Sequence, residues 1–351
     1  MPRLSFVFPI EDQSKFFAHY DVIVQRPKSV GEVYATPYDY YYIAQNTNSI
    51  LPNPDLKPER VFDYEFGFQQ EINRYSAITI TAYYKERKDM IQARPYLYAW
   101  PLTYWTFGNR DFSSTKGITL KYDLRRIQRV SMLLTYTLQF VEGTGSNSNA
   151  SGLLQNFIAA QLPNMRFTYP LSNDSRHIIN VNLDYRFADN DGPMIGNSRI
   201  LQNSGINLVF RARSGEPYTR NANALRNVNV IQGQFNDARL PWHYMMDLRI
   251  DKDFAFKARR RTPDEPVRYS RVGLTAFVYI TNLLNTKDIL NVYPFTGRPD
   301  DDGYLVSPQG LQDAQSVVNP QSYRDLYGMS LLNPGFLNNP RRINLGLTVK
   351  F

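Results

Sequence analysis

The sequence predicts an all-β protein, an antiparallel up-and-down transmembrane β-barrel with long extracellular loops. Three observations lead to this fold class. Apolar and polar residues alternate with a period of two along the 351-residue chain, which is typical of strands with one apolar and one polar face. Short and long connections alternate between these segments, as on the two rims of such a barrel. Aromatic residues make up 14% of the chain and gather near segment ends, where barrels carry aromatic girdles.

About eleven strands are expected, most of them near the roughly 9–11 residues that a tilted strand needs to cross a bilayer. In chain order they lie at about 4–8, 16–24, 62–72, 77–91, 115–125, 130–141, 176–187, 205–213, 244–254, 271–281 and 343–351. No linker divides the chain, so residues 1–351 are expected to form a single partial barrel domain.

Four of these segments alternate most clearly. Segment 62–69 sets four aromatic residues on one face against acidic, glycine and glutamine residues on the other. Segments 118–125 and 178–187 set aliphatic and aromatic residues against threonine, lysine, aspartate, asparagine and arginine. The last segment, 343–351, places five apolar residues on one face. The other seven segments follow the same rule, so each strand is expected to have one face suited to lipid and one suited to water.

The connections indicate on which side of a membrane each strand end lies. Short connections are expected at 9–14, 73–74 and 126–129, with middle-length ones at 188–204 and 256–269. Long loops, with short helices expected at 153–162 and 310–318, lie at 26–60, 92–113, 142–174, 214–240 and 286–340. Loops beyond about 12–15 residues are uncommon in compact soluble domains, but a barrel carries them outside the cell. The last strand then runs toward the short-turn rim, which places the C-terminus in the periplasm.

Composition and motifs argue against an enzyme, a metalloprotein and a nucleic-acid-binding protein. The absence of cysteine excludes disulfide scaffolds, thiolate zinc sites and cysteine nucleophiles. No phosphate-cradling or nucleophile-elbow motif is present, so no catalytic residue and no cofactor is expected. The three histidines are isolated, and the acidic runs 189–192 and 300–303 lack the full calcium-loop spacing, so no metal site is expected. The basic run 257–261 lacks interleaved aromatic residues and predicts a solvated rim or a contact with anionic headgroups.

A soluble β-sandwich is the main structural alternative, because it also alternates apolar and polar residues. Polar residues on the second face of nearly every strand, and the lack of compact hairpins on both sides, argue against it. Because unpaired backbone groups are costly in lipid, a membrane sheet must close on itself. Eleven is an odd number, and the strand-like start carries no export signal. We therefore expect the chain to be the C-terminal half of a longer barrel.

Four motifs, in this order, resemble TonB-dependent outer-membrane receptors. The stretch Asn53–Arg60, followed by Phe62–Phe68, resembles their signature NPxLKPE…YExGxE. Residues Tyr83–Ile91 are similar to the strand that follows it in that family. Residues Val278–Asn285 resemble the NLFN box, with leucine in place of the usual phenylalanine, and Ile343–Phe351 resembles the outer-membrane sorting signal.

The resemblance implies half of a 22-stranded barrel that is filled by an N-terminal plug. This chain would supply barrel wall and extracellular loops in the outer membrane of a Gram-negative cell. It implies energised import of a bulky nutrient of the siderophore, glycan or peptide class, through a TonB system that acts on a plug outside these residues. A non-transporting outer-membrane barrel that serves as an adhesin or scaffold remains the functional alternative.

Aromatic residues in the long loops are the candidates for ligand contact, because flat rings offer large contact area at low entropic cost. They are Tyr38, Tyr40, Tyr41, Tyr42, Trp100, Tyr104 and Trp105. Packing of these rings against each other and against interfacial lipid is the alternative. The resemblance assigns the sorting signal to Leu347, Val349 and Phe351, which would bind the barrel assembly machinery. Outer-membrane lipid and a surface lipoprotein are further expected partners.

Overall fold

The computed structural model describes residues 1–27, 33, 41, 50–96, 98–99, 103–146, 167–194, 196, 199–225, 230–260 and 268–350, and for 257–260 and 268–272 only the backbone. The long strands are β1 (Arg3–Glu11), β2 (Ser14–Gln25), β4 (Glu59–Asn73), β5 (Ser76–Tyr96), β6 (Tyr104–Ile127), β7 (Val130–Gly143), β9 (His177–Arg186), β10 (Ser204–Arg213), β13 (His243–Arg260), β14 (Arg268–Thr281) and β15 (Arg342–Lys350). The short strands are β3 (Ile50–Leu51), β8 (Tyr169–Pro170), β11 (Pro217–Tyr218) and β12 (Ala238–Arg239). The helices are α4 (Pro308–Ser316) and α5 (Pro320–Leu331), with 3₁₀ turns η1 (Tyr304–Val306) and η2 (Pro334–Phe336).

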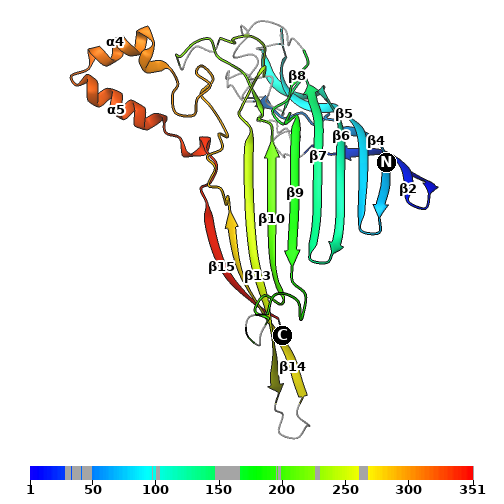
Figure 1. The fold of residues 1–351 in the computed structure, drawn as a ribbon. Coiled ribbons are helices and arrows are strands. Elements are labelled where there is room, and N and C mark those ends of the chain that lie inside the picture. Colours follow the sequence, from blue (N-terminus) through cyan, green and yellow to red (C-terminus); the bar gives the residue numbers. More distant parts are fainter. Residues whose placement is uncertain are drawn as a thin grey trace.

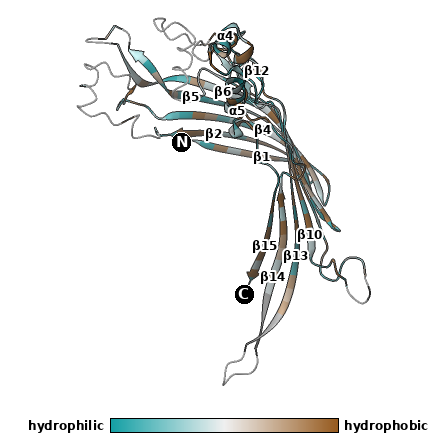
Figure 2. Ribbon diagram, turned by 90° about the vertical axis from the view of Figure 1, so that its left-hand side faces the viewer, coloured by the Kyte–Doolittle hydropathy of each residue, from teal (hydrophilic) through white to brown (hydrophobic). Residues whose placement is uncertain are grey.

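The eleven long strands of the described chain form one sheet in which each strand pairs with the next along the chain. Every one of these pairings is antiparallel, from β1 with β2 to β14 with β15 (Figure 1). Seen from the side, the sheet is strongly curved, and β1 and β15 are its two open edges (Figure 2). The predicted fold class is confirmed: the chain is an up-and-down antiparallel wall, and this part of a barrel is not closed.

The register of the strand pairs places the apolar side chains of neighbouring strands on the same face of the sheet. A single row of partners crosses β6, β7, β9, β10 and β13 as Leu120, Tyr136, Ile179, Ala212 and Tyr244. The alternative of a β-sandwich requires such a face to be covered by a second sheet. Instead, the last strand exposes this face, because Ile343 is 61%, Leu345 79% and Leu347 70% accessible. A continuous exposed apolar surface of this kind suits hydrocarbon better than water.

On the opposite face, three aromatic rings lie over glycines of a neighbouring strand. The ring of Phe277 on β14 occupies the space where a side chain of Gly346 on β15 would begin, and Tyr83 does the same over Gly117. The third ring, Phe17 of β2, lies over Gly67 of β4. Glycine permits this close approach and lets the sheet bend toward the ring, as in curved sheets generally. These contacts therefore help to make the polar face the concave one.

The strands are staggered, so both rims of the sheet slant (Figure 1). The row of partners through Val7 of β1 reaches β13 at His243. The row through Gly346 of β15 reaches the same strand at Asp251, eight residues farther along. Such a stagger is what tilts the strands of a closed barrel relative to its axis.

The connections alternate in length as predicted, with one correction. The long loop expected at 92–113 is mostly strand, because β5 continues to Tyr96 and β6 begins at Tyr104. The two strands keep pairing beyond a bulge near Met90 and rise above their neighbours. The helix expected at 310–318 is present as α4, and α5 follows it without having been predicted. The helix expected at 153–162 lies outside the described residues.

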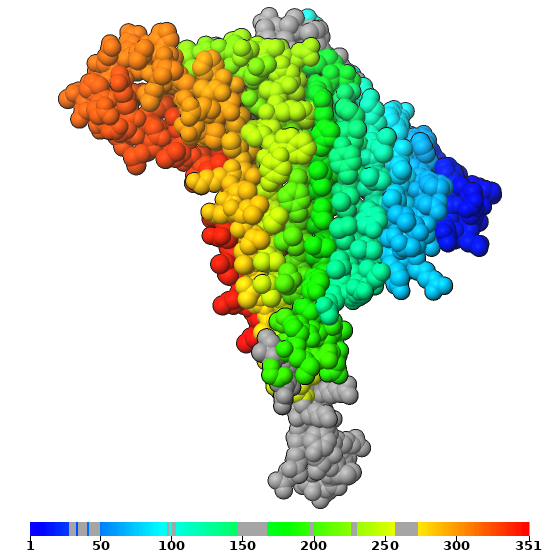
Figure 3. Space-filling view, viewed as in Figure 1, coloured from blue at the N-terminus to red at the C-terminus, as the bar shows by residue number. Residues whose placement is uncertain are grey.

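The two helices form a lobe that stands out from the long-loop rim beside β15 (Figures 1 and 3). The lobe has a closed neck, because Leu290 N donates to Phe336 O at 2.8 Å and Asn338 N donates to Asp288 O at 3.0 Å. Both ends of the 282–341 excursion therefore leave the sheet at one point.

Candidate functional site

The concave polar face is the first part of the candidate site. Its basic residues bind acidic residues at 2.7 to 3.0 Å: Lys85 binds Asp63 and Glu65, Arg211 binds Asp247, and Arg186 binds Asp251. Asp63, Asp247 and Asp251 are buried. Buried carboxylates need a paired charge or hydrogen bonds. A face built from such pairs, opposite an apolar face, is what a water-filled barrel lumen requires.

Two small apolar clusters of described residues lie at the long-loop rim. In the first, Ile91 and Ala93 of β5 pack with Phe107 of β6, and Trp105 and Ile50 pack against them. In the second, Val141 of β7, Tyr169 of β8 and Leu171 are buried together. These clusters hold the projecting strands and short loop strands in place above the sheet.

Asp174 joins the second cluster to the next loop. Asp174 is 1% accessible. Its side chain accepts a hydrogen bond from Val141 N at 2.8 Å and pairs with Arg239 of β12. Burial raises the pKa of the Tyr169 phenol to about 12, so this ring stays uncharged. The loop is therefore tied down through one carboxylate and one apolar cluster.

Three of the predicted ligand-contacting aromatics fall within the described residues. Tyr41 is 60% exposed. Tyr104 and Trp105 lie in β6 rather than in a loop, and as strand neighbours they point to opposite faces. Tyr104 stacks on Tyr96 with ring centres 5.4 Å apart, whereas Trp105 packs on the first apolar cluster. The other four, Tyr38, Tyr40, Tyr42 and Trp100, lie outside the described residues.

The predicted sorting residues occupy the apolar face of β15. Leu347 pairs in register with Ala276 and Val349 with Leu274, and both side chains remain exposed. Phe351 lies outside the described residues. The outer edge of β15 thus presents both free backbone groups and an apolar stripe, within the described part of the sheet.

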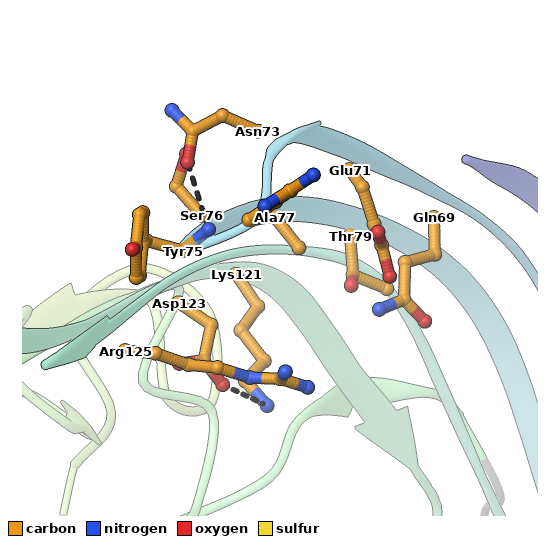
Figure 4. Close-up of a pocket in the computed structure, with 11 residues that line it drawn as sticks. Gln69, Glu71, Asn73, Tyr75, Ser76, Ala77, Thr79, Lys121, Asp123 and Arg125 are labelled. Atoms are coloured by element: carbon orange, nitrogen blue, oxygen red, sulfur yellow. Dashed lines mark hydrogen bonds and ion pairs between the residues drawn. The ribbon is translucent and has the colours of Figure 1, made fainter.

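A small polar pocket lies at the short-turn rim (Figure 4). Its volume is about 70 Å³, and it is lined from three strands by residues that include Gln69, Glu71, Thr79, Lys121 and Arg125. Because a water molecule occupies about 30 Å³ in the liquid, this pocket holds only a few waters. It is too small for a bulky ligand.

Loop residues outside the sheet form tight charged contacts. Arg129 binds both carboxylate oxygens of Asp191, at 2.8 and 2.7 Å, and this hydrogen bonding lowers the pKa of Asp191 to about 2. In the helical lobe, Tyr304 donates to Asp313, which raises the pKa of the phenol and lowers that of the carboxyl. The first pair links the turn between β6 and β7 to the connection between β9 and β10, and the second links η1 to α4.

Asn282, which lies in the segment that resembles the NLFN box, organises the neck of the excursion. It is 2% accessible and has φ of 53°. Its side-chain amide donates to Thr286 O and Asn339 O, each at 3.0 Å, and its carbonyl accepts from Thr286 N at 3.0 Å. Its backbone N–H donates to Asp247 on the polar face at 3.0 Å. The motif therefore connects the excursion to the polar face of β13.

Within the described ranges, no three acidic or histidine side chains converge as they would around a metal ion. Over the same ranges, none of the helices combines the length and hydropathy needed to span a membrane. The acidic run 300–303 serves as a turn, since Asp301 and Asp302 accept hydrogen bonds from Gly303 N and Tyr304 N.

Comparison with known proteins gives a family. A family model described as TonB dependent receptor-like, beta-barrel matches residues 1–283. That family comprises receptors and transporters rather than a class of enzymes. No curated protein sequence matches the chain.

Solved structures resemble the chain in fold. The outer membrane transporter YddB from Escherichia coli is 14% identical, with a TM-score of 0.51 over 80% of this chain and 36% of that one. The FpvAI–pyocin S2 complex gives 11% identity and a TM-score of 0.50, over 84% and 29%. The ferripyoverdine receptor of the Pseudomonas aeruginosa outer membrane, bound to ferripyoverdine, gives 12% and 0.49, over 85% and 30%. The chain thus spans about a third of the length of these structures.

Proposed function

We propose that this chain, which belongs to the TonB dependent receptor-like β-barrel family, forms part of the wall and the external loops of an outer-membrane receptor. In this proposal the receptor imports a bulky nutrient by energised transport. Residues 1–351 act in this proposal as one partial barrel domain. One observation carries it: the sheet has an exposed apolar face and a concave face of paired charges. The first suits lipid and the second suits an aqueous passage.

The two rims give the proposed orientation. The long-loop rim, with its apolar clusters and helical lobe, faces outward from the cell. The short-turn rim and the end of β15 face the periplasm, as barrels of this class place their tight turns. The apolar stripe of β15, with Leu347 and Val349, is proposed to bind the barrel assembly machinery together with Phe351. A surface lipoprotein is a further proposed partner of the outward rim.

The nutrient is proposed to contact the aromatic residues of the outward rim. Tyr41 and Tyr104 support this most directly, since Tyr41 is exposed and Tyr104 forms a stacked pair with Tyr96 at the β5–β6 hairpin. Tyr38, Tyr40, Tyr42, Trp100 and Trp105 belong to the same proposal. Siderophores, glycans and peptides all offer groups that stack on such rings.

Uptake by cells tests the proposal. Cells that carry the full receptor gene or its deletion are supplied with labelled siderophore, glycan and peptide pools, with and without a working TonB system. Accumulation of one class should require both the receptor and TonB. The deletion strain with the gene restored is the control, and accumulation that persists without TonB would contradict energised import.

The alternative function, an adhesin or scaffold, makes a different prediction in the same cells. The exposed apolar residues of the helical lobe favour it, among them Leu326, Met329 and Leu332 at 63–67% accessibility. An adhesin would bind surfaces or other cells equally well without TonB and would cause no accumulation of solute.

A further inference from the structure

A cavity lies on the polar face directly under the long-loop rim. Its volume is about 340 Å³. Its floor is made by the ends of β9, β10 and β13 nearest the long-loop rim. In one row of register partners, Arg213 of β10 lies between Ile178 and His243. In the next row on this face, Arg211 lies between Asn180 and Met245. The neck of the 282–341 excursion covers it with Asp288, Leu290 and Asn338. It is therefore a formed site in the wall, separate from the predicted loop aromatics.

His243 is the unusual group in this cavity. Its side chain is buried, with 6% accessibility, and neither ring nitrogen has a hydrogen-bond partner among the described residues. The other two histidines differ, since His19 bonds Ser5 at 2.9 Å and His177 bonds Tyr136 at 3.0 Å. A buried polar group without a partner is costly and calls for a ligand or water.

Each arginine around the cavity is paired with a carboxylate. Arg211 binds Asp247 at 3.0 Å and Arg213 binds Glu216 at 2.9 Å. The Asp288 carboxylate accepts a hydrogen bond from Tyr244 N at 3.1 Å. Three carboxylates therefore stand against two guanidinium groups, and this surplus negative charge disfavours an anionic ligand. Ile178, Met245 and Leu290 add apolar lining, which suits an uncharged group with an apolar body.

We propose that this cavity binds an uncharged amide group of the imported solute, with an aliphatic body against Leu290 and Met245. At neutral pH the imidazole offers one N–H donor and one acceptor nitrogen. An amide carries the complementary carbonyl acceptor and N–H donor, so a single group satisfies both nitrogens of His243. The inference rests on the proposed function, because it requires the polar face to line the solute passage. Peptides and acetamido sugars both carry such an amide.

NMR tests the inference on the full receptor, with isotope-labelled histidine side chains and embedded in nanodiscs. The probes are N-acetyl-leucinamide, N-acetylglucosamine and the carboxylate N-acetyl-leucine, and His243 is assigned by difference from His243→Phe. We expect saturable shifts of the His243 ring signals with an amide probe and none at His19 or His177. Preference for the leucinamide identifies a peptide-type amide, and preference for the sugar identifies an acetamido group; both support amide recognition.

Variants separate binding from folding. His243→Phe keeps an aromatic ring but removes both ring nitrogens, and it should bind the preferred amide about thirtyfold more weakly, as expected for the loss of about two hydrogen bonds. Leu290→Ala should weaken binding several-fold, and the exposed Leu284→Ala should not change it. The amide titration of the wild-type receptor still tests the inference if a variant fails to fold.

Two results would overturn the inference: no saturable shift at His243 with either amide, or tighter binding of the carboxylate than of both amides. TonB-dependent uptake is measured separately, so uptake that persists while the cavity binds neither amide removes this inference alone. Loss of TonB dependence alongside amide binding removes the proposed function instead.

Discussion

Asn282 shows how one side chain can fix the geometry of a 60-residue excursion. Replacing it with alanine leaves the Thr286 N–H and two backbone carbonyls without their partner in a buried place. We expect Asn282→Ala to lower the free energy of opening the neck by about 1–3 kcal/mol. Hydrogen exchange at the Leu290 amide, which donates to Phe336 O across the neck, measures this opening. Leu284→Ala, two residues away and exposed, is the control, and equal protection in both variants would contradict the role of Asn282.

Asp191 gives a prediction on pH. Its folded pKa of about 2 lies below its ordinary value because Arg129 binds it. The pair therefore stabilises the folded loop above the ordinary carboxyl pKa, and this stabilisation is lost as pH falls through about 2. The Gly192 amide, which donates to Asp191 at 2.7 Å, should report this midpoint by NMR. In Arg129→Gln the midpoint should rise toward the ordinary value; an unchanged midpoint would assign the shift to another cause.

Some residue roles follow from sequence and others do not. The turn chemistry of Asp301 and the strand-exit position of Asn282 can be predicted, because both act on nearby backbone. The isolation of His243 in the sequence hides its place in a cavity. That place depends on the register of β9, β10 and β13 and on a loop segment that returns 45 residues later.

At the scale of elements, the ring of Phe277 and the missing side chain of Gly346 make a matched pair across β14 and β15. Gly346→Ala should lower stability by about 1–3 kcal/mol, because the added carbon overlaps the ring. Phe277→Ala in the same chain should restore part of the loss. The measurement is the temperature at which the full receptor loses its folded migration on a gel.

Gly273→Ala is the control for that experiment, since an added carbon there would meet only Lys350 Cβ at 3.7 Å, an ordinary contact. Equal effects at Gly273 and Gly346 would show that the ring contact does not matter.

The elements also show where sequence patterns mislead. Period-two alternation locates the strands well, but the β5–β6 hairpin continues past the predicted end at 91 because its residues keep pairing beyond the bulge near Met90. The helix α5 has a local signal that the apolar pattern obscures: Asn319 caps it and Pro320 opens it, the usual start of a helix. These two residues are sufficient to predict the start of α5.

For the whole molecule, the orientation of the wall can be measured because the chain contains no cysteine. Leu332 in the helical lobe and Met194 on the short-turn side are 67% and 64% exposed. Leu332→Cys should react with a membrane-impermeant maleimide in intact cells. Met194→Cys should react only after the outer membrane is permeabilised. The reverse result would invert the proposed orientation.

The two faces of the wall are foreseeable from sequence, because they follow directly from alternation. The stagger of the strands is not, since it depends on which residues pair across each hairpin and on bulges such as the one between Arg87 and Met90. The cavity under the rim depends on this pairing as well, since its lining comes from three paired strands and from the neck.

The closed neck makes the helical lobe a self-contained insertion. Because Ile289 bridges to Leu337 and both flanks are tied to the sheet, residues between them can be exchanged as a cassette. In the proposed orientation, a foreign epitope whose two ends lie equally close together could be grafted there for display on the cell surface, while the wall beneath keeps its shape.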